Sequence, residues 1–324
     1  MLTRLLTNHY WIPAYAMFGL GLVVPGDYSS LRWTIPLFLC GILYCTCLKI
    51  SLTEVRGAFG LRSMSLVAAM APMRLIVLPL VTFAITWLIA PAWAPGVFLA
   101  SMMPAGFSTV AFTDLNGGNR MLALVLLLAT SAACPFTIPP LLEWFAGAGG
   151  HIAITDIASR SAYLLVLLAV PFAAAQATRA IAPAFVARHS SRWNLGAFVS
   201  GCVLGFFSVA VNRASWGALH LVDMISPLAF SCVAVGVCAG ASLLAHLLLR
   251  RADAVAFSCG NIYPNGGLAA AFATQFFPGD AHILLPCLLM QAPIIASISA
   301  YRWLLQRAAP AEAADTSPVP AKST

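Results

Sequence analysis

One arginine of this sequence lies within a long apolar run, where a charged side chain needs a partner. Arg74 interrupts SLVAAMAPMRLIVLPLVTFAITWLIA, residues 65–90. An arginine at the centre of a bilayer costs roughly 2.5–3.5 kcal/mol on insertion scales, so it rarely faces lipid. A guanidinium can hold an anion through paired hydrogen bonds. No acidic residue is predicted at the same depth, so we expect Arg74 either to hold an anion or to reach backbone carbonyls or interfacial water.

Two Pro/Gly clusters carry the other polar side chains that could bind a ligand. Proline removes a helical hydrogen bond and glycine relaxes the backbone, so each cluster predicts a broken helix. An amide or hydroxyl at such a break can bond either a ligand or the freed backbone, and both interpretations stay open for these residues. The candidate binding residues beside Arg74 are Thr109, Thr113, Asn261, Tyr263 and Asn265, and the candidate break or gating residues are Pro104, Gly106, Gly118, Asn119, Pro264, Gly266 and Gly267.

Other chemistry has little support in the sequence. The nine cysteines include only one close pair, Cys45 and Cys47, and their spacing matches no zinc or redox motif. No nucleophile with a base, no phosphate-binding loop and no metal cluster is apparent. We therefore expect no enzyme, no catalytic residue, no metal site and no cofactor.

The composition indicates a membrane protein. Of 324 residues, 61% are apolar and 8% are charged, whereas a soluble domain carries about 25% charged residues. The net charge of +7 could suggest a nucleic-acid partner. The charges fall between apolar windows instead, so the expected partner is the lipid bilayer and not nucleic acid.

Ten apolar windows, bounded by charged residues or Pro/Gly clusters, predict an all-α polytopic membrane protein with ten transmembrane helices. The windows are 10–24, 31–51, 66–90, 95–116, 121–145, 157–176, 195–211, 222–249, 254–277 and 281–305. No small-x-small cleavage site follows Val24, so we expect the first window to be a helix and not a signal peptide.

The basic residues predict the orientation of these helices. With a cytoplasmic N-terminus, thirteen of the seventeen basic residues lie inside, three (Arg32, Arg160 and Arg213) lie outside, and Arg74 lies within a span. This distribution satisfies the positive-inside rule, so both termini are expected to be cytoplasmic, in the cytoplasmic membrane of a bacterium. Residues 1–305 form one transmembrane unit in this interpretation, and residues 308–324, rich in Ala, Pro and small polar side chains, are expected to be a disordered cytoplasmic tail.

The two Pro/Gly clusters belong to an internal repeat. Pro104-Ala105-Gly106 and Pro264-Asn265-Gly266 stand 160 residues apart, and each is followed by Phe-Thr or Phe-Ala-Thr, by Gly-Asn or Gly-Asp, and by a Leu-rich run. Five predicted spans separate the copies, so repeat 1 (about 10–145) and repeat 2 (about 157–305) must have inverted topology. Paired interrupted helices indicate a secondary transporter with its site at mid-membrane. The alternative is that both breaks are packing kinks.

At these residues the sequence resembles the bile acid:sodium symporter family. The stretch MMPAGFSTVAFTDLNGGNRMLAL is similar to the family's fourth helix, and GNIYPNGGLAAAFA is similar to its ninth-helix pattern E-x-x-x-Q-N-x-G-L-A. CGILYCTCLKISLTEVRGAF and LAVPFAAAQATRAIAP add weaker similarity to the second and sixth helices. The resemblance implies a panel domain, a core domain in which helices four and nine are broken and cross, and alternating-access transport of organic anions.

The resemblance also implies sodium sites, and here the sequence departs from it. Thr109-Val110 stands where the family has Ser-Asn, and its expected hydroxyl positions in helix five fall at Ala123 and Leu127. Gly260 replaces the family's Glu, Pro264 its Gln, and Arg74 a Gln of the third helix. Sodium prefers oxygen ligands, as other hard cations do. We therefore interpret Arg74 as a fixed positive charge that stands in for bound sodium and helps to hold an anionic substrate.

The expected function is secondary transport of a small organic anion, without sodium coupling through the usual family sites. Three alternatives stay open. The first is a non-transporting membrane sensor or partner-binding protein on the same fold, with no cavity at Arg74 and Asn265. The second is a sodium-dependent symporter that uses backbone ligands. The third is a related ten-helix carrier of the arsenite or auxin-efflux type, although the fourth helix lacks the cysteine that would favour the arsenite branch.

Overall fold

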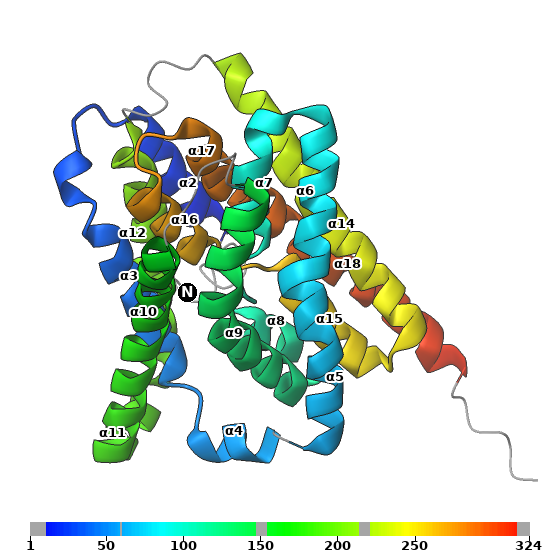
Figure 1. The fold of residues 1–324 in the computed structure, drawn as a ribbon. Coiled ribbons are helices and arrows are strands. Elements are labelled where there is room, and N and C mark those ends of the chain that lie inside the picture. The colour runs from blue at the N-terminus through cyan, green and yellow to red at the C-terminus, as the bar shows by residue number, and fades with distance from the viewer. Residues whose placement is uncertain (1–10, 59, 147–153, 214–220, 316–324) are drawn as a thin grey trace, which may run out of the picture.

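The fold is helical throughout the part of the chain that the structure describes. The computed structural model describes residues 11–58, 60–146, 154–213 and 221–315. Figure 1 shows the arrangement of its helices. The α-helices are α2 (Trp11–Val23), α3 (Thr34–Cys47), α4 (Leu52–Ala58), α5 (Leu61–Pro72), α6 (Leu78–Ile89), α7 (Ala94–Ser101), α8 (Thr109–Leu115), α9 (Arg120–Ala146), α10 (Ile154–Ile181), α11 (Pro183–Arg188), α12 (Ser190–Ala210), α14 (Ile225–Leu248), α15 (Arg251–Ile262), α16 (Gly266–Phe276), α17 (Ala281–Leu289) and α18 (Gln291–Asp315).

Seven helices within the described residues are long and apolar enough to cross a membrane. They span Ser29–Cys47, Arg62–Ile89, Arg120–Phe145, Asp156–Ile181, Arg192–Ala210, Ile225–Leu248 and Ala281–Arg307, and a shorter apolar helix covers Ile12–Val23. Two further predicted windows, 95–116 and 254–277, are each divided into two short helices, as the Pro/Gly clusters predicted. The protein is therefore a helical multi-pass membrane protein.

Four helices, α2, α3, α10 and α12, form a bundle, and we call it the four-helix bundle (Figure 1). Within it, α10 is joined to α3 by hydrogen bonds at the C-terminal end of α3. There Gln176 donates to the carbonyls of Cys47 and Ile50, and Arg179 Nη1 donates to the Leu48 carbonyl at 2.5 Å. The last carbonyls of a helix lack partners within the helix, and a cation near them also complements the helix dipole. These bonds fix α10 against α3.

The remaining helices pack beside this bundle. Helices α5, α6, α14, α15 and α18 lie on the opposite side of the view in Figure 1, α7, α8 and α9 lie between, and α16 and α17 overlap the bundle near α2 in this view. Between α5 and α6 the helix widens into one π-helical turn, Met73–Val77, in which the Leu78 N–H bonds to the Met73 carbonyl. Pro79 has no N–H to continue the α-helical pattern at this point. Arg74 lies in this turn and is completely buried.

A capping box begins the short helix α4. The backbone N–H of Ser51 donates to Glu54 Oε2 at 2.9 Å, and the Glu54 N–H donates to Ser51 Oγ at 3.0 Å. Each residue thus satisfies a free N–H of the other, as S-x-x-E sequences commonly do at a helix start. The backbone hydrogen bond from Ser51 holds the pKa of Glu54 below its ordinary value.

The ends of two predicted windows differ from the structure. The window 281–305 is divided at Met290 into α17 and α18, and α18 continues to Asp315. It therefore includes the first part of the segment expected to be a disordered tail, whereas 316–324 lie outside the described residues. Helix α10 likewise extends past its predicted window to Ile181. In both cases small, helix-favouring alanines follow the apolar residues, so helix propensity carries the helix beyond the hydropathy boundary.

Candidate binding site

The two broken helices meet, and each break satisfies the backbone of the other. The chain between α7 and α8 runs antiparallel to the chain between α15 and α16, with one isolated β-bridge between Ala105 and Pro264. The Gly106 N–H donates to the Tyr263 carbonyl at 2.7 Å, and the Asn265 N–H donates to the Pro104 carbonyl at 2.9 Å. Backbone groups in an apolar interior need such partners. We call this pair of segments, 102–108 and 263–265, the crossover.

Glycines permit close approach at the crossover. A Cβ added to Gly106 would collide with the Tyr263 ring, and one added to Gly266 would coincide with the side-chain amide of Gln291. A Cβ on Gly267 would lie 2.8 Å from Leu204 Cδ2, on α12. These positions exclude larger side chains for reasons of packing, which agrees with their predicted role at the break.

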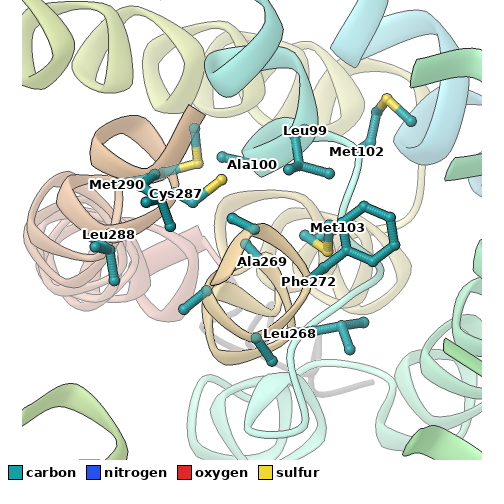
Figure 2. Packing of buried hydrophobic residues seen from close by; sticks show 14 of the residues in the cluster. Leu99, Ala100, Met102, Met103, Leu268, Ala269, Phe272, Cys287, Leu288 and Met290 are labelled. Atoms are coloured by element: carbon teal, nitrogen blue, oxygen red, sulfur yellow. The ribbon is translucent and has the colours of Figure 1, made fainter. Parts of the chain in front are cut away.

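Apolar packing holds the crossover in place. Figure 2 shows Met103 beside Phe272, with Ala269 and Leu268 on the same helix, α16. Met102 and Met103 are fully buried, as is Phe272. This cluster joins α16 to α7 and α17, so the broken segments rest on a rigid apolar support.

A cavity of about 280 Å³ lies between the crossover and the four-helix bundle. Ligand pockets commonly begin near ~300 Å³, so its size suits a small organic molecule. The crossover and the start of α16 contribute six of the residues predicted from the sequence, Gly106, Tyr263, Pro264, Asn265, Gly266 and Gly267. The opposite wall comes from α2, α3 and α12 and includes Tyr15, Phe18, Phe198 and Ser208.

Asn265 presents the polar group of this cavity that is best placed to bind a ligand. Its Oδ1 accepts the Leu268 N–H at 3.1 Å and so caps helix α16. Its Nδ2 has no hydrogen-bond partner within the described residues, although only 7% of the residue is exposed. An unpaired buried amide costs free energy that a bound acceptor would recover. The cap orients the side chain, and the free N–H₂ group remains for a ligand.

Gln291 was not predicted from the sequence. It begins α18, lines the same cavity and occupies the space that Gly266 leaves. A signal was present, because Gln291 is an uncharged polar residue inside the apolar run LLPCLLMQAPII. The candidate residues were chosen beside the Pro/Gly clusters, and Gln291 is not adjacent to either cluster in the sequence.

Arg74 and Asn261 lie together, but in a different cavity. This second cavity measures about 10 Å³ and shares only Pro264 with the larger one. Arg74 Nη1 donates to the Ser101 carbonyl at 2.6 Å, whereas its Nε and Nη2 have no partner within the described residues. Both side-chain polar atoms of Asn261 likewise lack a partner. The structure thus brings Arg74 to the crossover and separates it from the residues around Asn265.

Thr109 and Thr113 line neither cavity. Both are fully buried on α8, and they face α15 and the turn after α8. A Cβ on Gly260 would lie 3.9 Å from Thr109 Cγ2, and one on Gly118 would lie 2.7 Å from Thr113 Cγ2. Their sequence pattern suggested a cavity lining, but the side of a helix that meets the cavity depends on its rotation within the fold.

The surroundings of Thr109 are apolar. A Cβ on Gly260 would lie 2.7 Å from Leu126 Cδ2, so Leu126 fills the space into which a larger side chain at Gly260 would extend. Ala123 and Leu127, at the two hydroxyl positions of the resemblance, are completely buried. Within the described residues no three His, Cys, Asp or Glu side chains gather as metal ligands. Thr109 Oγ1 itself has no hydrogen-bond partner within the described residues.

Gly118 and Asn119 join two helices away from both cavities. Asn119 Oδ1 accepts the Leu122 N–H at 3.1 Å and caps α9, and its Nδ2 donates to Asp253 Oδ1 at 2.7 Å. Asp253, at the start of α15, also pairs with Arg62 at 2.5 Å. This cluster could not be predicted from the sequence, because Asp253 is 134 residues from Asn119 along the chain.

A second junction joins the four-helix bundle to the far end of α16. Arg160 on α10 pairs with Glu143 on α9 and lies over the rings of Phe276 and Phe277, 5.5 and 5.0 Å from their centroids. Asn212 Nδ2 donates to Thr274 Oγ1 at 2.9 Å. We call this the α16 clasp. The α16 clasp closes the interface between the four-helix bundle and the other helices at the C-terminal end of α16.

Comparison with known proteins identifies a relationship. The model of a family described as the sodium bile acid symporter family matches residues 36–218. This range covers more than half of the chain and includes the first break, and it ends before the second. No curated protein matches the chain.

Proposed function

The chain belongs to the sodium bile acid symporter family, and from that premise we propose that it moves an organic anion across a membrane. The family consists of transporters and not enzymes, so membership implies a secondary transporter. The observation that supports this substrate class best is the cavity at the crossover, into which Asn265 presents a hydrogen-bond donor that has no partner among the described residues. Donors that converge on one cavity suit a carboxylate or sulfate group.

The proposed architecture has ten spans in two inverted repeats. The seven long apolar helices, the helix Ile12–Val23 and the two broken helices α7–α8 and α15–α16 make up this number. The four-helix bundle corresponds to the panel domain, and the other helices to the core. The distribution of basic residues supports cytoplasmic termini and, as predicted from the sequence, the cytoplasmic membrane of a bacterium.

The anion would bind against the N-terminus of α16. This helix has 11 residues, and Gly266 and Gly267 at its start line the cavity beside Asn265. A helix N-terminus carries partial positive charge, which favours an anion. The N–H groups of Gly266 and Leu268 already donate to the Pro264 carbonyl and to Asn265 Oδ1, so the Asn265 amide is the main donor. Tyr263 and Gln291 supply further polar atoms at the same wall.

Arg74 would act on the anion through its charge and not through contact. Its guanidinium lies in the second cavity, which shares Pro264 with the first. In an apolar interior, a charge acts over longer distances than it does in water. Arg74 thus supplies a fixed positive charge near the site, and its bond to the Ser101 carbonyl helps to position it.

Sodium coupling through the usual family sites is not part of the proposal. Leu126 fills the space beside Gly260, and Pro264 has no side-chain oxygen. Without a coupling cation, the flux would follow the gradient and the membrane potential. Each monovalent anion that leaves the cell would gain about 2.3 kcal/mol per 100 mV.

Alternating access would move the four-helix bundle against the rest of the protein. The α16 clasp closes one end of their interface, so it must open for the cavity to reach the opposite side of the membrane. The charge-assisted and aromatic contacts of Arg160 would then break and re-form in each cycle.

A non-transporting sensor on the same fold is the main alternative. It would have no cavity at Asn265, and the cavity of about 280 Å³ therefore favours transport. A sodium-dependent symporter with backbone ligands is a second alternative, which the experiment below distinguishes.

The test is uptake and efflux of a panel of labelled organic anions in proteoliposomes, with and without a sodium gradient. Wild type, Arg74→Ala and Asn265→Asp would be compared. We expect sodium-independent flux that both substitutions lower. Flux that requires sodium would support backbone ligands, and no flux for any anion would support the sensor.

A further inference from the structure

Arg74 carries a buried charge that the protein compensates incompletely. The residue is 0% exposed, and one hydrogen bond, to the Ser101 carbonyl, is its only bond to a described residue. A guanidinium stays protonated in proteins and offers five N–H donors. Its Nε and Nη2 have no partner. A buried charge without a partner is strongly unfavourable.

The surroundings of Arg74 supply little negative charge. Within the described parts of the chain, no carboxylate forms an ion pair with Arg74. Ser101 is the last residue of α7, so its carbonyl belongs to the negative end of that helix. A helix C-terminus contributes roughly half an elementary charge at most, and α7 has only 8 residues. Part of the charge of Arg74 therefore remains uncompensated.

The second cavity has the lining of a site for one small anion, and its free space in this conformation is about that of one water molecule. About 10 Å³ is available, and a single water-sized particle needs ~10–15 Å³ on the same measure. Besides Arg74, Ser101 and Asn261, the wall is made of Ala234, Val235, Cys238, Ile262, Pro264 and Met290. Asn261 is fully buried, and its amide can turn an N–H₂ group toward the cavity.

We propose that this second cavity binds one monovalent inorganic anion of about the size of chloride, held by Nε and Nη2 of Arg74 and by the Asn261 amide. A water molecule is smaller than chloride and could satisfy the hydrogen bonds without any movement of the wall, but it would leave the charge uncompensated. Chloride requires a small outward shift of the apolar side chains that form the wall. An organic carboxylate is too large for the available volume. The site is distinct from the organic-anion cavity, and its occupancy does not depend on transport.

One consequence does rest on the proposed function. Both anions interact with the same positive charge, and Pro264 lines both cavities. Chloride at Arg74 would therefore weaken the binding of an organic anion in the larger cavity, and the organic anion would weaken chloride binding by the same factor.

The first test is binding of radiolabelled chloride to the purified full-length protein without any organic anion. We expect one saturable site in wild type and none in Arg74→Met. Asn261→Ala should lower the affinity about tenfold, since it removes one of the binding groups. Arg120→Met is the matched control, because it removes a half-exposed arginine outside both cavities and should bind chloride as wild type does.

A second measurement needs no variant and covers the case in which Arg74→Met fails to fold. Crystals of wild type soaked in bromide should show one anomalous peak between the Arg74 guanidinium and Asn261. A water molecule in that position with no anomalous signal, or equal chloride binding by a folded Arg74→Met protein, would overturn the proposal. Loss of organic-anion flux with chloride binding intact would refute the transport function and leave this site standing.

Discussion

The two cavities on either side of Pro264 differ in size, access and charge. The larger one, about 280 Å³, lies between the four-helix bundle and the crossover and presents neutral donors such as the Asn265 amide. The smaller one, about 10 Å³, is walled mainly by apolar side chains and contains a guanidinium. Ligand contact and positive charge are thus supplied by different residues in different places. A neutral amide can be buried at a lower cost than a charge, whereas a charge that is kept from water acts more strongly on its surroundings.

Removal of the buried charge should have the largest effect. We expect Arg74→Met to lower organic-anion flux in proteoliposomes by tenfold or more, because the fixed charge is lost. Stability should change little or increase, since replacing a buried charge by an apolar side chain of similar volume is often neutral or stabilising. Thermal unfolding of wild type and Arg74→Met measures this change in stability. Arg74→Lys keeps the charge and should retain more flux than Arg74→Met, and equal flux in wild type and Arg74→Met would show that the smaller cavity has no electrostatic role.

Two substitutions at Asn265 separate its capping role from its binding role. Asn265→Ala removes the cap of α16 and should destabilise the protein by about 1 kcal/mol, and it should lower flux severalfold. Asn265→Asp keeps an oxygen that can accept the Leu268 N–H, but it places a negative charge in the larger cavity. We therefore expect the Asn265→Asp protein to unfold at nearly the wild-type temperature. It should transport anions less well than the Asn265→Ala protein does. If the Asn265→Asp protein transported anions at the wild-type rate, Asn265 would cap α16 and would have no role in anion binding.

A smaller effect is expected where the larger cavity meets the four-helix bundle. In Gly267→Ala the new methyl group would lie 2.8 Å from Leu204 Cδ2 and 3.2 Å from Leu39 Cδ1. Both contacts are leucine side-chain ends, which can shift, so the protein should fold while the cavity narrows. KM should rise a few fold for bulky anions and less for small ones. Gly236→Ala is the control, because nothing lies within 4 Å of its added Cβ and it lines neither cavity.

The smallest effect is expected at the capping box of α4, away from both cavities. Glu54→Gln should cost less than about 1 kcal/mol at neutral pH and leave flux unchanged. The folded pKa of Glu54 lies below its ordinary value because of the Ser51 hydrogen bond, so the ionised form stabilises the fold. This contribution is present above the ordinary glutamate pKa and is lost as pH falls through the lowered one. Unfolding curves of wild type and Glu54→Gln at neutral and acid pH test this contribution. A difference in stability between the two proteins that persists in acid would contradict the prediction.

Much of the site could be anticipated from local sequence features. The Pro/Gly clusters predicted both breaks, because the missing N–H groups and the backbone freedom are properties of those residues alone. The hydropathy windows located most helices, and the ends of α10 and α18 differed because alanine extends helices beyond apolar segments. For Arg74 the sequence left two alternatives, an anion or backbone carbonyls and interfacial water, and its bond to the Ser101 carbonyl is of the second kind.

What the sequence by itself determined is the class of the protein and the points at which its helices break, because composition and backbone chemistry are carried by the residues themselves. The tertiary structure alone decided which polar residues share a cavity. Thr109 and Asn265 were both candidates by type, yet packing turned Thr109 toward Gly260 on α15 and Asn265 toward the cavity. Such choices depend on the rotation and contact of helices far apart in the chain, as does the joining of the two breaks at Ala105 and Pro264.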